Sequence, residues 1–131
     1  FDPEVQAPMG TRLKRIIPGI AESYRCEAEV VYRDQVPVLV NHDGHVEVVK
    51  QAAYRCVGED NYHIAEPTLA GEDFALYVQK IPGSFFWLGS GPQTNAEQNY
   101  GLHHPKFTID ESCLPVGAAM LASIAWDRSQ S

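Results

Sequence analysis

The sequence has no apolar run of membrane-spanning length, no pattern of a secretory signal and no low-complexity segment. It is also poor in positive charge, because ten Lys and Arg stand against seventeen Asp and Glu, for a formal net charge of -7. The calculated isoelectric point is about 5.1. An acidic chain of this kind disfavours nucleic acid or an anionic membrane surface as its partner. We therefore expect neither of these partners.

Cysteine is scarce and carries no ligand spacing. The three residues Cys26, Cys56 and Cys113 are odd in number and widely separated, so neither a disulfide framework nor a cysteine zinc site is indicated. Reduced thiols of a cytoplasmic protein are the simpler expectation. The glycine patterns that cradle nucleotide phosphates are missing as well. The chain begins on Phe1 inside an apparent junction of two elements, and we expect it to be a fragment.

What is present suits a globular fold. With 44% apolar residues among 131, the chain can bury roughly two thirds of its unfolded surface. Asp2-Pro3-Glu4 is a good helix opening, and apolar residues at three- and four-residue steps continue the helix despite Pro8 and Pro18, most securely over 11–23. Further helices are predicted from Asp43 to a stop at Gly58, over 74–80 and over 114–126.

Extended segments alternate with these helices. Residues 26–33 alternate in the manner of a half-buried strand, and 61–65 are interpreted as a short strand. Residues 84–89 form a short, almost wholly apolar run that suits a strand covered on both faces. A strand covered on both faces is typical of an α/β sheet, so we expect an α/β fold. A strand over 26–33 requires lateral partners that the neighbouring sequence does not supply. The proline-containing crossing 36–41 suggests a domain boundary near residues 38–41.

The histidine pair His103-His104 stands out, because Pro105 follows it directly. Proline disfavours a helical conformation in the residue before it, so we expect an extended His104, with the two side chains on opposite faces. Only one of them can then face a given site. By itself the triplet fits either surface histidines or a metal ligand. His42 and His45, at a helix start, are expected to be solvated, and His63 is expected to be a strand side chain.

Two carboxylates, Glu72 and Asp73, fall in the first turn of the predicted helix 74–80. There they can bond free amides and meet the positive end of the helix dipole. The alternative is that they orient a loop that carries a metal ligand.

Several ordered motifs resemble those of the M20 metallopeptidases, most closely the branch of hippurate hydrolases, N-acyl-amino-acid amidohydrolases and auxin-conjugate hydrolases. The similarity is dense from about residue 66 to 123. It rests on Gly71-Glu72-Asp73-Phe74 with Tyr77, on Ile81-Pro82-Gly83-x-Phe85-Phe86-x-Leu88-Gly89-x-Gly91, and on Leu102-His103-x-Pro105-x-Phe107-x-x-Asp110-Glu111-x-x-Leu114-Pro115-x-Gly117-Ala118.

This resemblance implies a two-metal α/β catalytic domain with an inserted α+β satellite domain that is often used for dimerisation. Residues 1–38 would be the last helix and strand of the satellite domain. Residues 39–131 would be the C-terminal part of the catalytic domain. A homodimer is therefore expected, together with the missing N-terminal part of the same polypeptide.

The resemblance also assigns roles. The histidine of the family's L-H-x-P turn is a metal ligand, here His103, whereas His104 occupies the variable position. The other ligands, the catalytic glutamate and the histidine that polarises the substrate carbonyl are expected upstream, so no catalytic residue is assigned here. The ions would be two divalent metals, zinc or manganese, with cobalt or nickel as alternatives.

Because one histidine cannot hold a catalytic ion, the 131 residues alone should hydrolyse nothing. The substrate of the whole protein would be a small N-acyl amino acid, cleaved at its amide bond by metal-activated water. Two alternatives stay open. One is a carboxypeptidase or dipeptidase of the same family, acting on a peptide, and the other is a non-catalytic binding module with a degenerate site.

Overall fold

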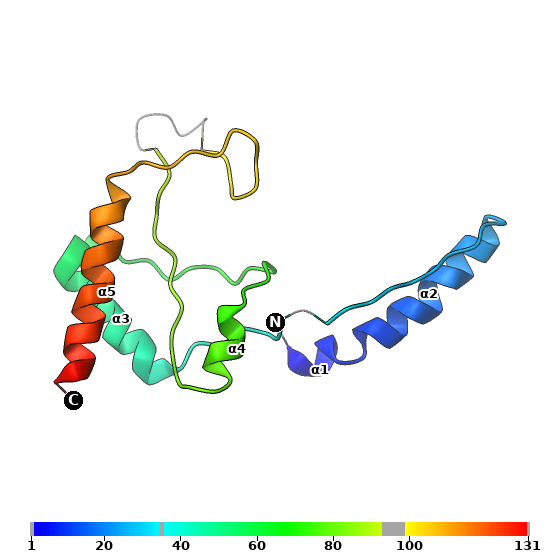
Figure 1. The fold of residues 1–131 in the computed structure, drawn as a ribbon, viewed down its shortest axis with the longest axis horizontal. Helices are drawn as coiled ribbons and strands as arrows, with labels where there is room; N and C mark the ends of the chain where they lie inside the picture. The colour runs from blue at the N-terminus through cyan, green and yellow to red at the C-terminus, as the bar shows by residue number, and fades with distance from the viewer. Residues whose placement is uncertain (1, 35, 93–98, 131) are drawn as a thin grey trace. The chain divides into compact units, whose positions relative to one another are not determined.

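The computed structural model describes residues 2–34, 36–92 and 99–130 (Figure 1). Contacts divide the chain into two compact units, each of which is described by itself. The first comprises Phe1–Val40 and Glu66–Pro82, and the second comprises Asn41–Ala65 and Gly83–Ser131. The predicted domain boundary between residues 38 and 39 stays a prediction. The elements in order are the helices α1 (Pro3–Gln6), α2 (Met9–Ser23) and α3 (Asp43–Val57), the 3-10 helix η1 (Glu59–Asn61), and the helices α4 (Phe74–Val78) and α5 (Cys113–Ser129).

The helix opening predicted at Asp2 is confirmed. The backbone N–H of Glu4 donates to Asp2 Oδ1 at 2.8 Å, and Pro3 occupies the first turn, where no donor is lost. The helical run is interrupted before Met9, next to Pro8, and resumes as α2, which contains Pro18. The prolines predict a kinked or late-starting helix, and the long helix α2 indeed starts after Pro8 and continues through Pro18.

The other helix bounds agree with the sequence to within a few residues. The start of α3 differs, because His42 rather than Asp43 is the N-cap and no side chain caps this helix. Gly58 ends α3 with φ of +84°, a conformation that favours glycine. The helix α4 is shorter than predicted and α5 is longer. None of the helices in the described ranges has the length and apolarity needed to cross a membrane.

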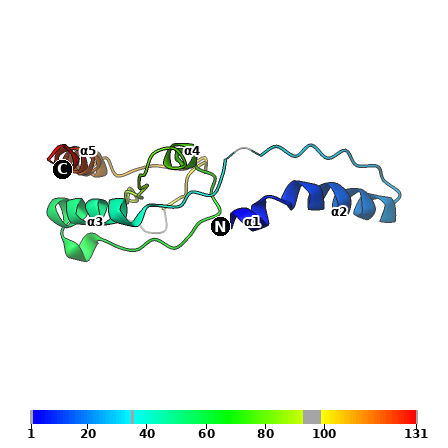
Figure 2. The same ribbon diagram turned by 90° about the horizontal axis from the view of Figure 1, so that it is seen from below.

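The predicted strands are not formed within the described residues. In the first unit, residues 26–34 run back alongside α2 (Figures 1 and 2), and Tyr32 packs on Gly10, where an added Cβ would lie 2.5 Å from its Cδ1. In the second unit, neither 61–65 nor 84–89 is a strand. A strand needs a neighbour for its backbone groups, and no ladder partner for these segments occurs in the part of the chain that is described.

A side chain takes the place of a neighbouring strand next to Phe85. Asn41 Nδ2 donates to the carbonyl of Phe85 at 2.9 Å, and the N–H of Phe85 donates to Asn41 Oδ1 at 2.8 Å. The next residue continues the pairing, because the N–H of His42 donates to the carbonyl of Gly83 at 3.1 Å. The segment 83–85 is thereby fixed to the start of α3.

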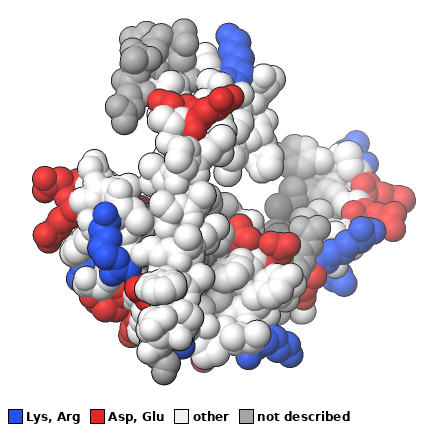
Figure 3. Space-filling view, turned by 60° about the vertical axis from the view of Figure 1, so that its left-hand side comes forward, with Lys and Arg blue, Asp and Glu red and all other residues white. Residues whose placement is uncertain are grey.

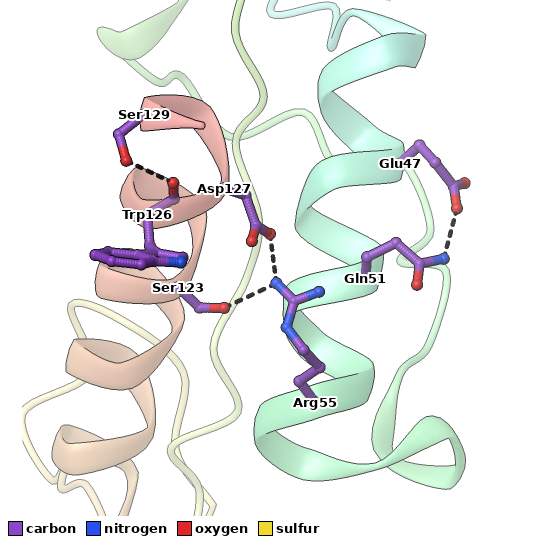
Figure 4. Close-up of polar contacts among 7 residues, drawn as sticks. All are labelled: Glu47, Gln51, Arg55, Ser123, Trp126, Asp127 and Ser129. Atoms are coloured by element: carbon purple, nitrogen blue, oxygen red, sulfur yellow. Dashed lines mark hydrogen bonds and ion pairs between the residues drawn. The ribbon is translucent and has the colours of Figure 1, made fainter. Parts of the chain in front are cut away.

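The core of the second unit lies between α3 and α5. Its buried members are Val49, Ala52, Ala53 and Met120, and partly buried residues such as Phe86 pack against them. Figure 4 shows Arg55 of α3 reaching two side chains of α5: Nη2 donates to Ser123 Oγ at 2.9 Å and forms an ion pair with Asp127. Trp126 points away from α3 in the same view and is 68% exposed. The helices α3 and α5 are therefore joined by an apolar core and by polar contacts of Arg55.

Candidate metal-binding site

The histidine pair lies on a turn of the second unit. The N–H of His104 donates to the carbonyl of Gly101 at 3.2 Å, which closes a four-residue turn with Leu102 and His103 at its centre. His103 has φ of +68°, in the left-handed region, at the third position of the turn. A positive φ at this position and not at Leu102 is the pattern of a type II turn, which normally requires glycine or asparagine there. The extended conformation was predicted for His104, and the backbone of the preceding residue, His103, is left-handed rather than extended.

The imidazole of His103 is exposed, and no hydrogen bond or ion pair to it occurs within the described ranges. A histidine on a turn that has no partner among the described residues is available to an external ligand. Because an imidazole nitrogen is a common donor to divalent transition metals, the exposed side chain fits the role of one metal ligand.

His104 is placed quite differently. The N–H of Lys106 donates to His104 Nδ1 at 3.1 Å, and the N–H of Phe107 donates to the carbonyl of His104 at 2.9 Å. Its ring stacks on that of Tyr100, with centroids 4.3 Å apart and planes 6° from parallel. The structure thus puts both histidines on one turn, and among the described residues it is the His104 side chain that makes hydrogen-bonding and stacking contacts.

The far end of this loop is anchored by Asp110. Its N–H donates to the carbonyl of Ser90 at 2.8 Å, and its Oδ1 accepts from the N–H of Ser112 at 2.9 Å. The backbone hydrogen bond from Ser112, followed by a side-chain hydrogen bond to the same residue, lowers the pKa of the Asp110 carboxyl below its usual value. The carboxylate consequently stabilises the start of α5, where Ser112 supplies no side-chain cap.

Glu72 and Asp73 belong to the first unit. Glu72 Oε1 accepts from the N–H of Phe74 at 3.0 Å, so this carboxylate binds a free amide at the start of α4, as a capping role requires. Asp73 is the N-cap by position, and its backbone carbonyl accepts from the N–H of Leu76 at 2.9 Å, but its side chain makes no capping hydrogen bond to this helix. Their alternative role beside a metal ligand stays a prediction.

The remaining histidines do not add a site. The rings of His42 and His45 lie with centroids 6.3 Å apart, and His42 Nδ1 accepts from the N–H of Gly83 at 3.4 Å, which occupies one of its two nitrogens. Across the described residues, no group of three or more His, Cys, Asp or Glu side chains is placed to hold a metal ion. His103 therefore fits as one ligand of a larger set and not as a site by itself.

Sequence reasoning missed Tyr100 and Asn41. Tyr100 contacts His104 across a tight turn, whereas Asn41 contacts Phe85, 44 residues further along the chain, and spacing alone reveals neither contact. A weak signal for Tyr100 was its place four residues before His104, within reach across a tight turn.

Comparison with known proteins identifies the protein family to which the chain belongs. The sequence model of peptidase family M20/M25/M40 matches residues 3–127, nearly the whole chain. The chain belongs to this family.

Two relatives and one solved structure show what the chain resembles. It is 36% identical to the N-acetylcysteine deacetylase of Bacillus subtilis over 95% of this chain and 31% of that protein. It is 33% identical to the IAA-amino acid hydrolase ILR1-like 2 of Arabidopsis thaliana over 87% of this chain and 26% of that protein. The crystal structure of the Bacillus subtilis YXEP protein, described as a dinuclear metal binding peptidase from the M20 family, matches with a TM-score of 0.68 and 33% identity, over 95% of this chain and 33% of that one. The chain thus spans about a third or less of the length of these relatives.

Proposed function

We propose that this chain is the C-terminal part of a metal-dependent amidohydrolase that cleaves the amide bond of N-acyl amino acids. The proposal is supported by family membership and by relatives named as a deacetylase of N-acetylcysteine and a hydrolase of IAA-amino acids. The observation that carries it is the exposed imidazole of His103, presented on a turn in the Leu102-His103-x-Pro105 motif. Residues 1–38 would end a satellite domain, and residues 39–131 would complete an α/β catalytic domain.

The proposed site holds two divalent ions, by analogy with the dinuclear metal binding of the YXEP protein. The chemistry that such a pair supplies is activation of a water molecule and polarisation of the amide carbonyl. In this chain, His103 would bind one ion through its imidazole. Asp110 would hold the second end of the same loop through Ser90 and Ser112. The general base and the remaining ligands would come from the preceding part of the polypeptide, and the enzyme would act as a cytoplasmic homodimer.

Acidic and basic side chains are scattered on the face of the described residues seen in Figure 3, with no broad basic area. Together with the net charge of -7, this supports a small substrate over a polyanion. The class of substrate is consistent with the names of both relatives.

The decisive experiment compares His103→Ala with His63→Ala in the intact protein. His63 is also an exposed histidine and serves as the matched control. We expect His103→Ala to lose its bound metal, as measured by elemental analysis after desalting. The same variant should also lose the hydrolytic activity that releases amino acid from N-acetyl, N-benzoyl and indole-acetyl conjugates. His63→Ala should retain both. A His103→Ala protein with full metal content would refute the proposal.

A peptidase of the same family is the second candidate, since the matching solved structure is described as a peptidase. The two activities are separated by offering dipeptides beside N-acyl amino acids to the wild-type protein. A higher kcat/KM for dipeptides would favour the peptidase. Intact protein that binds no metal would instead favour a non-catalytic module.

A further inference from the structure

The left-handed conformation of His103 needs an explanation. In the described ranges, the positive-φ residues other than glycine are Arg25 and His103. Arg25 directly follows the end of α2, where such a conformation commonly terminates a helix, and the N–H of Cys26 closes that end on the carbonyl of Ala21. His103 follows no helix. A strained residue of this kind persists only where its surroundings hold it, which directs attention to its neighbours.

Two consecutive turns share His104. Its N–H closes the turn that begins at Gly101, and its carbonyl accepts from Phe107, which closes the next turn around Pro105. Its side chain adds a third connection through Nδ1, which accepts from the N–H of Lys106. A residue fixed at three points in this way fixes the peptide unit that joins it to His103.

The ring of His104 is held in turn by Tyr100. The near-parallel stack, at 4.3 Å and 6°, joins Tyr100, the residue before the first turn, to His104, the last residue of that turn. Lys106 Nζ lies 5.8 Å from the centre of the Tyr100 ring, in the range of a cation–π contact. The stack therefore spans the base of the loop whose tip contains His103.

We propose that Tyr100 and His104 are positioning residues, whose stacked rings hold His103 in the left-handed conformation that aims its imidazole at a metal ion. This inference rests on the proposed function, since it supposes that His103 is a ligand. His104 itself is not a ligand through Nδ1, because that nitrogen accepts the N–H of Lys106. Outer residues that orient a metal ligand typically change metal affinity by about 10- to 100-fold when they are replaced.

The test uses the intact protein, with zinc affinity measured by competition with a chelator. We expect Tyr100→Ala and His104→Ala each to weaken zinc binding by about 10-fold or more. Tyr100→Phe, which keeps the stacking ring, should restore near-wild-type affinity. Tyr24→Ala removes another exposed tyrosine, 78% exposed, and should have no effect.

A second readout needs no metal. Hydrogen exchange of the amides of His104 and Phe107 in metal-free protein should be faster in Tyr100→Ala than in the wild type, because the two turns lose their brace. Tyr100→Phe should exchange at the wild-type rate. If Tyr100 only stabilised the fold as a whole, Tyr100→Ala would lower the melting temperature without specifically speeding the exchange of the His104 and Phe107 amides.

The outcomes separate the two proposals. If His103→Ala loses zinc while Tyr100→Ala and His104→Ala bind it as tightly as the wild type, the positioning role is wrong and the proposed function stands. If Tyr100→Phe binds as weakly as Tyr100→Ala, the ring stack is not the cause and the inference is also overturned. If His103→Ala retains zinc, both proposals fail.

Discussion

Asn41 shows how one side chain can replace an absent strand. Its amide makes two reciprocal hydrogen bonds with the backbone of Phe85 and ties an otherwise extended segment to the start of α3. Each bond is partly buried, so its loss is not fully compensated by water.

We predict that Asn41→Ala lowers the free energy of unfolding by about 1–3 kcal/mol, because two hydrogen bonds are removed together. Urea denaturation of the intact protein measures the change. Asn61→Ala is the matched control. Within the described residues the Asn61 side chain makes one exposed hydrogen bond, to the carbonyl of Val57, so its removal should lower the free energy of unfolding by less. Equal losses in the two variants would show that the reciprocal pair has no special role.

The Asp110 carboxyl should make the free energy of unfolding depend on pH in the acidic range. Its pKa is lowered in the folded state by the N–H of Ser112, so its contribution is present above the ordinary value of 3.8 and is lost as the pH falls through the lower folded value. We predict that Asp110→Asn is less stable than the wild type near neutral pH and that the difference shrinks on acidification.

Urea unfolding of metal-free protein between about pH 6 and about pH 2 tests this dependence. Asp60→Asn is the control, because no hydrogen bond to the Asp60 side chain occurs within the described ranges. A constant difference between Asp110→Asn and the wild type at every pH would contradict the argument.

For single residues, the sequence predicts where a turn lies better than it predicts the backbone conformation within the turn. The His103-His104-Pro105 triplet identifies a turn, and proline explains why no helix continues through it. The left-handed φ of His103 was not predictable, because a histidine in place of glycine gives no local signal. The stacking of His104 on Tyr100 depends on that turn, so it was not predictable from the sequence either.

At the scale of elements, α2 and the segment beside it depend on a small residue. Tyr32 lies so close to Gly10 that an added Cβ would fall 2.5 Å from its ring, whereas nothing lies within 4 Å of a Cβ added to Gly19 in the same helix. The two glycines therefore form an internally matched pair.

We predict that Gly19→Ala stabilises the protein by about 0.5–1 kcal/mol, the usual gain from alanine in a helix. Gly10→Ala should not show this gain and should destabilise, since the Tyr32 ring has to move. Thermal unfolding of the intact protein compares them. A gain of similar size in both variants would show that Tyr32 is not packed on α2.

Helices were predicted well and strands were not, for a physical reason. A helix satisfies its backbone locally, so caps such as Asp2 and stops such as Gly58 can be read from neighbouring residues. The alternating segment 26–33 carries the pattern of a strand, but pattern alone provides no ladder partner. The α/β class accordingly remains a prediction for the larger domain.

At the scale of the whole molecule, the buried core is small. The buried apolar residues of the described ranges are Val49, Ala52, Ala53, Ala75, Val78, Cys113 and Met120, and the two that are fully buried, Ala52 and Ala75, have small side chains. Many large apolar side chains remain exposed, Ile64 at 90% being the extreme. Composition predicted a globular protein, but it could not predict how little of the core these residues complete by themselves.

The last prediction concerns residues 1–131 expressed alone. We expect no release of amino acid from N-acyl amino acids and no stoichiometric binding of zinc, because a catalytic ion needs about three protein ligands and the described residues bring no such group together. Circular dichroism shows whether the helices form. It thereby distinguishes a chain that does not fold from a folded chain that has too few metal ligands. The intact protein, assayed in parallel, should bind metal and hydrolyse the substrate. Metal-dependent hydrolysis by the 131 residues alone would mean that this stretch contains a complete site, and His103 would then need partners drawn from its own chain.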